Sequence, residues 1–405
     1  MHDLQRAVLA PVMKSWVRCR GAELRGISRP PAVGQVSSEG LDADRILIVG
    51  AGLAVGWGAA SHENALAGRL ARALSDLTSR GADVDIQSSP TMTIDTVMES
   101  LRSLTLRRYD AIVLTLGDFE ALDLVSERTW ARKLSATLAL LLAAVPPSTR
   151  VFLVGINSIR SVPIFDSRLG GIADAQAVAL NAVSATICAA LPRAVWMPLS
   201  PRGGTKGSRD LFSDYQRWAQ ELCDQMYDPL NVARAEGAAA LAIIDRDVVE
   251  RERQRDLDAL GILDTTTEDR FDRIVALARS LYGTESAAFS IIDRDRQWHK
   301  SRENIAWEQI ARVDSFCSIA IEDRGPFIVL DALADDRVSH SLMVTEDPHI
   351  RFYAGFPVES PSGERIGALC VFDPEPREAD DVDPTMLRQL AHLIQAELRV
   401  KPTFD

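Results

Sequence analysis

The stretch 315–373 decides the fold of the C-terminal half of this chain and reads SFCSIAIEDRGPFIVLDALADDRVSHSLMVTEDPHIRFYAGFPVESPSGERIGALCVFD. It contains three apolar segments rich in β-branched and aromatic residues, with turn-forming Pro, Gly, Ser and Asp between them. This pattern predicts an antiparallel sheet. Because one face of such a sheet must be covered, helices should flank it, and helical patterns occur at 265–282 and 387–398.

The borders of these flanking helices also carry signals. The helix at 265–282 begins with threonines that can cap it and with early acidic residues. Asp383 and Pro384 provide an N-cap and a first-turn proline for the last helix. Residues 286–301 predict two more strands, joined by a tight Asp-Arg turn.

The charge of the chain is unevenly distributed, which limits its partners. Residues 240–405 hold 33 acidic and 20 basic side chains, out of 57 and 45 in the whole chain, and residues 1–239 therefore hold 24 and 25. A domain with this acidic excess lacks the clustered Lys and Arg that hold a phosphate backbone. We therefore expect no nucleic-acid partner for the C-terminal half.

Cysteine usage and the N-terminus bear on the compartment. The five cysteines are scattered and show no CxxC or Cys/His metal spacing, which favours a reducing compartment and no metal site. The apolar patch at 7–13 is interrupted by Pro11 and is too short to span a membrane. We expect a cytoplasmic protein without stable membrane insertion; the alternative is that the N-terminus is an interfacial amphipathic segment.

The N-terminal half reads as alternating strands and helices after a linker at 21–44 that is rich in Gly, Pro, Ser and charge. Apolar strand-like runs alternate with helical stretches, which predicts a parallel sheet covered on both faces. The runs lie at 45–49, 83–87, 110–116, 150–156 and 194–198. Ligands of such sheets bind at the carboxyl ends of the strands, so the loops GAGLAVG (50–56) and GDFEALD (117–123) are the ones to examine.

Residues 1–228 resemble the SGNH hydrolases, the GDSL-type esterase family, and the resemblance implies a flavodoxin-like three-layer fold. The family's strand followed by Gly-Asp-Ser aligns with RILIVGAGLAVGWGA, where Gly52 stands at the position of the nucleophile. Its Gly-x-Asn-Asp block aligns with residues 117–120, where Phe119 replaces the oxyanion-hole Asn. Its Asp-x-x-His block aligns with residues 210–213 ahead of YQRWA, and Ser213 replaces the His.

The loss of the catalytic residues can be checked without alignment. No histidine occurs between His62 and His299, so a Ser–His pair within this half would need His62 or His2. Loss of nucleophile or base costs about a millionfold in turnover, or about 8 kcal/mol of transition-state stabilisation. We expect a domain without hydrolase activity; the alternative is that Ser61, Ser213 or Asp118 rebuilds a different site.

Residues 229–261 predict a helical connector, Ala-rich at first and then densely charged. Its apolar residues recur at near-helical spacing, so it either mediates dimerisation or is a solvated linker helix. The predicted domains are therefore a leader and linker at 1–44, the hydrolase-like domain at 45–228, a connector at 229–256 and a C-terminal domain at 257–400.

The C-terminal domain resembles GAF domains over about residues 252–400. The landmarks, in the order of the family, are LDALGILDT, DRDRQWHKS, SFCSIAI, HIRFYAGFPV and GALCVFDPEPR. The resemblance implies an α+β domain with a central antiparallel sheet. It also implies a module that binds a small molecule or mediates protein interaction and dimerisation in signalling. No cofactor can be named.

Positions within these motifs suggest the ligand contacts Phe316, Cys317, His349, Arg351, Tyr353 and Cys370. Arg351 could pair with an anionic ligand, and Tyr353 could stack on the ligand or donate a hydrogen bond. The alternative is that His349 and Arg351 are structural and pair with Asp331 or Asp347, and that the two cysteines are core residues.

The function expected from these patterns is that of a non-catalytic signalling or regulatory protein. In it, a degenerate SGNH-like domain is joined to a GAF domain that senses an unidentified small molecule or mediates protein interaction. The expected protein partner is a second copy, in a homodimer, or a signalling protein. Two alternatives stay open. One is an esterase with a rewired active site that the GAF domain regulates, and the other is a structural dimerisation protein.

Overall fold

The computed structural model describes residues 3–102, 104–200, 211–241 and 246–400. It divides into two compact units, one comprising residues 1–40 and 44–242 and the other residues 41–43 and 243–405. Each unit has its own six-stranded sheet. The expected combination of an α/β and an α+β domain is therefore confirmed.

The N-terminal sheet has the strand order β1-β3-β2-β4-β5-β6. β2 to β6 are parallel in flavodoxin-like order, and β1 is antiparallel to β3 at the edge. All five strands expected from the apolar runs are present. The strands are β1 Val33–Ser37, β2 Asp44–Gly50, β3 Ala82–Ser88, β4 Ala111–Thr115, β5 Arg150–Val154 and β6 Ala194–Met197.

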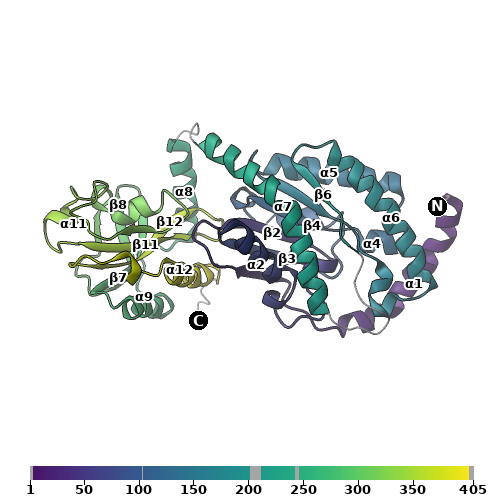
Figure 1. Cartoon of the computed structure of the whole chain (residues 1–405), viewed down its shortest axis with the longest axis horizontal. Helices are drawn as coiled ribbons and strands as arrows, with labels where there is room; N and C mark the ends of the chain where they lie inside the picture. Colours follow the sequence, from purple (N-terminus) through teal and green to yellow (C-terminus); the bar gives the residue numbers. More distant parts are fainter. Residues whose placement is uncertain (1–2, 103, 201–210, 242–245, 401–405) are drawn as a thin grey trace. The chain divides into compact units, whose positions relative to one another are not determined.

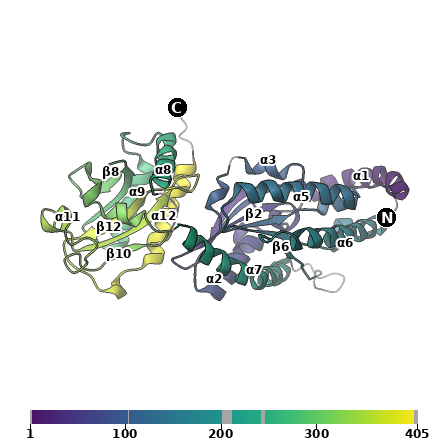
Figure 2. The same ribbon diagram turned by 90° about the horizontal axis from the view of Figure 1, so that it is seen from above.

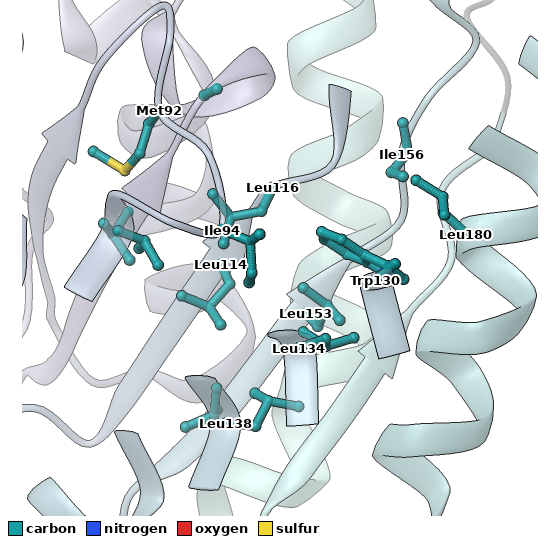
Figure 3. Close-up of a cluster of buried hydrophobic side chains, with 14 of the residues drawn as sticks. Met92, Ile94, Leu114, Leu116, Trp130, Leu134, Leu138, Leu153, Ile156 and Leu180 are labelled. Carbon is teal, nitrogen blue, oxygen red and sulfur yellow. The ribbon is translucent and has the colours of Figure 1, made fainter. Parts of the chain in front are cut away.

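Helices cover both faces of this sheet (Figure 2). Their side chains and those of the sheet form two separate apolar cores. α2 and α7 pack on one face, and α1, α3, α4, α5 and α6 on the other. Trp130 of α5 lies at the centre of the second core among leucines of β4, β5 and α6 (Figure 3). The helices are α1 Asp3–Arg25, α2 Leu66–Thr78, α3 Val97–Leu101, α4 Asp118–Leu122, α5 Glu127–Ala144, α6 Arg168–Ala189 and α7 Leu211–Leu241.

The segment expected to be a leader and linker differs from the prediction. α1 extends to Arg25, and β1 lies within the stretch read as linker. α1 docks on the unit through Met13, which is fully buried, and through the ring of Trp16, which packs on Phe165 with centroids 5.5 Å apart. β1 contains Gly and Ser and few apolar residues, so its sequence did not indicate a strand. An edge strand needs few apolar side chains, because its backbone pairs with a neighbour on one side only.

The connector also begins later than expected. α7 continues through Pro229 to Leu241, and Leu230 and Ala233 are buried in the N-terminal core. Burial of these two residues extends the helix past the proline because packing offsets the lost backbone hydrogen bond. The second connector helix, α8 Arg246–Leu260, belongs to the C-terminal unit.

The C-terminal sheet is antiparallel throughout, with the order β10-β11-β12-β7-β8-β9. Figure 1 shows β7, β8, β11 and β12 of this sheet in green to yellow. The segments PFIVLDA, HIRFYAGFPV and RIGALCVFD supply three of its strands, whereas SFCSIAI forms a short helix. The strands are β7 Ser286–Asp293, β8 Arg296–Glu303, β9 Gln309–Ala311, β10 Phe327–Val329, β11 Phe352–Glu359 and β12 Arg365–Asp373.

Two apolar cores lie on the two faces of this sheet. α8, α9 and α12 contribute to one, and α10 and α11 with their adjoining loops contribute to the other. Asp383 caps α12 as expected, accepting hydrogen bonds from the backbone of Thr385 and Met386 at 2.9 and 3.1 Å. The helices are α9 Asp269–Tyr282, α10 Phe316–Ala320, α11 Leu342–Thr345 and α12 Pro384–Arg399.

The threonines before α9 have a different role from the predicted one. The N-cap residue is Glu268, and its side chain makes no capping bond. Instead, Thr265 Oγ1 and the Thr266 carbonyl accept hydrogen bonds from Lys300 Nζ at 2.7 and 2.6 Å. They fix a fully buried lysine on β8, which also pairs with Glu268 at 2.7 Å.

α6 is long and apolar enough to cross a membrane by length and composition, and it is the one such helix in the described part of the chain. About a third of its most apolar window is buried, and Ala173, Ala177 and Leu180 pack into the core under the sheet. Core helices of soluble proteins pass the same test, so the observation is weak evidence for a membrane span.

Candidate functional site

The first candidate site is a buried polar cluster on the face of the C-terminal sheet that carries α10. Cys317 of α10, Tyr353 of β11 and Cys370 of β12 meet there, each at most 2% exposed. Ser315 caps α10 by accepting a hydrogen bond from the backbone of Ser318 at 2.9 Å, which sets the start of this short helix.

The sulfur of Cys317 is the centre of the cluster. Tyr353 donates its hydroxyl hydrogen to Cys317 Sγ at 3.2 Å, and Cys317 Sγ lies 3.7 Å from Cys370 Sγ. Phe316 packs on the Tyr353 ring with centroids 5.0 Å apart. Gly355 allows this arrangement, because a side chain there would overlap the hydroxyl of Tyr353. The structure thus brings together four of the six residues suggested by the GAF motifs.

The cluster extends to two residues that the sequence analysis did not select. Ser290 Oγ lies 3.9 Å from Cys370 Sγ and 3.0 Å from His299 Nδ1. Ser290 and His299 are direct cross-strand neighbours on β7 and β8. His299 Nε2 is buried and has no hydrogen-bond partner among the described residues. The histidine within DRDRQWHKS was the sequence signal that could have indicated this site. Sequence alone does not show which face of the sheet its side chain points to, because that depends on the strand register.

Burial controls the ionisation of this cluster. It lowers the pKa of His299 to about 3, with a smaller contribution from Arg302, so the imidazole is neutral. At Cys317 burial opposes the thiolate, but hydrogen bonding with Cys370, Tyr353 and Ser290 outweighs it and lowers the pKa. The hydrogen bond with Cys317 and burial raise the pKa of Cys370 well above that of an ordinary thiol. The two thiols are therefore chemically unequal.

His349 and Arg351 lie outside the cluster. His349 is exposed and has φ 56° after the cis Asp347–Pro348 peptide bond. Arg351 forms a two-bond ion pair with Asp331, at 2.6 and 2.7 Å, and both side chains are about one-third exposed. Arg351 thus has the Asp331 partner that the structural alternative named.

The second candidate site is the carboxyl edge of the N-terminal sheet, where the order of the strands reverses. Gly50 at the end of β2 pairs with Thr115 at the end of β4, so the loops after these strands are adjacent. Gly52 has φ 53°, and the carboxylate of Asp118 occupies the space that a side chain on Gly52 would take. Burial and the neighbouring Glu120 raise the pKa of Asp118 to about 7.

The other residues of this edge contribute to structure. Phe119 packs against the apolar core, and Glu120 accepts a hydrogen bond from the backbone of Ile94 at 2.6 Å. His62 Nε2 donates a hydrogen bond to the carbonyl of Pro31 at 2.8 Å. Two positions of the expected Asp-x-x-His block remain. Asp210 lies outside the described residues, and the backbone of Ser213 belongs to α7.

Metal ligation finds no support at either location. Across 3–102, 104–200, 211–241 and 246–400, no group of three or more His, Cys, Asp or Glu side chains is placed to hold a metal ion. The five cysteines form no disulfide.

Comparison with known proteins assigns a family to one part of the chain. Residues 266–398 match the GAF domain family. A curated cyclic di-GMP phosphodiesterase of Pseudomonas aeruginosa is 39% identical over 150 residues, which are 37% of this chain and 26% of that protein. The match thus spans about a quarter of the length of that relative.

Two solved structures are similar to different portions of the chain. Free methionine-R-sulfoxide reductase from Neisseria meningitidis matches with 19% identity and a TM-score of 0.28, over 38% of this chain and 91% of that chain. TesA matches with 16% identity and a TM-score of 0.36, over 46% of this chain and 99% of that chain.

Proposed function

We propose, from the premise that residues 266–398 form a GAF domain, that this chain is a signalling protein whose C-terminal domain senses a small molecule. The ligand would bind on the sheet face that carries α10, next to the cluster of Cys317, Tyr353 and His299. The relative in Pseudomonas aeruginosa that shares this part of the chain is named as a cyclic di-GMP phosphodiesterase.

The observation that carries this proposal is the unpartnered Nε2 of His299. Whichever ring nitrogen bears the proton, Nε2 is a buried donor or acceptor without a partner among the residues described. An unpaired buried polar group costs about 1–3 kcal/mol. A ligand that offers a complementary N–H, O–H or carbonyl group would recover this energy, which gives the domain a physical reason to bind one.

Native mass spectrometry of the freshly purified full chain tests the proposal. We expect an adduct of small-molecule mass that disappears on denaturation. The variant H299F should lose the adduct, whereas R351A should keep it, because Arg351 pairs with Asp331 away from the cluster. A bare protein mass, together with no rise in melting temperature with any compound of a metabolite panel, would instead support a purely structural module.

For the N-terminal domain we propose a non-catalytic role in regulation. The supporting observations are the glycine at the position of the nucleophile, the phenylalanine at the position of the oxyanion donor and the use of His62 in a hydrogen bond to Pro31. A rate enhancement needs a nucleophile and a base within reach of each other. The described residues at this edge do not present such a pair.

A rewired hydrolase is the second candidate, and Asp118 is the residue that favours it. A half-buried carboxyl group with a pKa of about 7 at the carboxyl edge of a parallel sheet is typical of a functional group. Hydrolysis of short-chain p-nitrophenyl esters separates the two candidates. We expect no turnover above buffer. Turnover that disappears in D118N, S61A or S213A would establish the hydrolase.

We further propose a cytoplasmic homodimer without a nucleic-acid or membrane partner. The scattered cysteines, without CxxC or metal spacing, support a reducing compartment such as the cytoplasm. The acidic excess of residues 240–405 argues against a nucleic-acid partner. The exposed valines of α8, Val248 and Val249, support a second copy as partner, since an exposed apolar pair on a charged helix suits a dimer contact. The same native mass spectrum gives the oligomeric state, and V248E/V249E should yield the monomer.

A further inference from the structure

Cys317 and Cys370 are the one pair of described cysteines with sulfur atoms in contact. They come from different elements, α10 and β12, and are separated by 53 residues in the sequence. The other buried cysteines, Cys188 of α6 and Cys223 of α7, sit in apolar cores of the N-terminal unit. The chain thus contains one buried thiol pair and two buried thiols that serve as internal comparisons.

We propose that Cys317 and Cys370 form a redox-active dithiol that hydrogen peroxide converts to an intramolecular disulfide. The thiolate of Cys317 attacks one oxygen of the peroxide, breaks the O–O bond and becomes a sulfenic acid, with release of hydroxide, which takes up a proton. The thiol of Cys370 then attacks that sulfur, and its sulfur-bound proton and the departing hydroxyl leave as water. Two thiols are oxidised by two electrons, and one peroxide is reduced to two waters.

The surroundings of the two sulfurs assign these roles. Tyr353 donates a hydrogen bond to Cys317 Sγ at 3.2 Å, so the attacking atom is the one with a fixed donor. Such donors stabilise a thiolate, and the pKa of Cys317 is lowered accordingly. Burial raises the pKa of Cys188 to about 11, and burial with nearby acidic groups raises that of Cys223 to about 12. These two thiols lack the activation that Cys317 has.

The geometry permits the bond. The two sulfur atoms are 3.7 Å apart, so they must approach by less than about 2 Å to reach the disulfide bond length. The moving element is α10, a single turn of five residues, while Cys370 is fixed in the ladder between β11 and β7. Short helices covered by loops open locally at a low free-energy cost, which also admits a molecule as small as peroxide.

Oxidation of the two cysteines would also affect residues outside the cluster. Arg312 lies five residues before Cys317 and donates hydrogen bonds to both carboxylate oxygens of Glu250 on α8, at 2.6 and 3.3 Å. A disulfide that pulls α10 toward β12 therefore acts on the segment that holds the connector helix. The dithiol would act in this way whether or not the domain also binds a ligand.

Peptide mapping after peroxide treatment tests the proposal. The folded full chain is exposed to a slight excess of hydrogen peroxide, alkylated under denaturing conditions and digested with trypsin, which releases residues 313–324 and 366–377. We expect these two peptides to be found cross-linked. The cross-link should form at least about tenfold faster than any oxidation of Cys188 or Cys223, because a larger share of Cys317 is thiolate. Peroxide-treated samples without a 313–324 to 366–377 cross-link, in a protein with unchanged circular dichroism, would overturn the proposal.

Variants assign the two steps. In C370A the sulfenic acid of Cys317 should persist and react with a 1,3-diketone probe, and in C317A Cys370 should stay reduced. Y353F keeps both thiols and the ring packing, and we expect it to slow the cross-link several-fold, so it provides a test even if a cysteine variant fails to fold. Oxidation of Cys370 in C317A at the wild-type rate, or an unchanged rate in Y353F, would contradict the assigned roles.

Discussion

The carboxylate of Asp118 points at the α-carbon of Gly52. Gly52 follows β2 and Asp118 begins α4 after the adjacent strand β4, and a Cβ added to Gly52 would overlap Asp118 Oδ2. The site where the resemblance to SGNH hydrolases places a nucleophile is therefore filled from the neighbouring loop. This contact accounts for the glycine, whereas burial and the neighbouring Glu120 raise the pKa of the aspartate.

G52A should destabilise the N-terminal unit more than an ordinary glycine substitution. At φ 53° the alanine costs about 1 kcal/mol in backbone strain, and displacement of the Asp118 carboxylate should raise the total to about 2–3 kcal/mol. G283A is the matched control, since Gly283 has φ 56° and nothing within 4 Å of an added Cβ. Tryptophan fluorescence in a urea titration measures the first effect, because five of the seven tryptophans precede residue 243. An equal loss of unfolding free energy in the two variants would show that the Asp118 carboxylate moves aside without a measurable cost.

The raised pKa of Asp118 predicts a stability that falls as pH rises. The unfolded carboxyl ionises near pH 3.8 and the folded one near pH 7, so between these values the folded state holds the extra proton. The contribution is fully present below pH 4 and is lost by about pH 8. It amounts to at most about 4 kcal/mol by the conversion of pKa to free energy. Subtracting the urea stabilities of D118N from those of the wild type at each pH isolates it, and a flat difference would refute the shift.

His299 predicts the opposite dependence in the GAF domain. Its folded pKa of about 3 lies below the unfolded value of 6.5, so the unfolded state binds the extra proton in between. Stability is therefore fully present above pH 6.5 and declines as the pH falls toward 3. Hydrogen exchange of the β12 amides, compared between wild type and H299N, should show this decline only with His299 present. H340N is the control for the substitution itself, because His340 is an exposed histidine of the same domain.

K300M should destabilise the GAF domain strongly. The ammonium group of Lys300 is fully buried and holds Thr265, Thr266 and Glu268 before α9. Methionine removes the ammonium group from these partners, and because Glu268 is about one-third exposed and can be solvated, we expect a loss of about 1–3 kcal/mol. R351M tests the contrast at the surface, where we expect no measurable change in the urea midpoint. A K300M midpoint equal to that of the wild type would mean that solvent replaces the lysine.

Local patterns were sufficient for the strands with continuous or repeated apolar runs. β2, β4 and β5 are buried along their whole length, and their sequences predict this directly. β1 was not predicted from the sequence, because only Val36 of its five residues is buried and no apolar pattern results. The helical stretch at 215–226 was recognised, but its continuation through Pro229 depends on the burial of Leu230 and Ala233 against other elements.

The sequence by itself determined the two fold classes, the GAF motifs and the absence of a serine and histidine in the hydrolase positions, because each is a matter of residue type and short-range spacing. Only the tertiary structure decided which of those residues meet. It brought Ser290 and His299 to Cys370 through the pairing of three strands, and it turned Arg351 toward Asp331 instead. It also directed Asp118 into the space at Gly52. The physical reason is that strand register and loop packing set side-chain direction over many residues, whereas sequence patterns report only periodicity within one element.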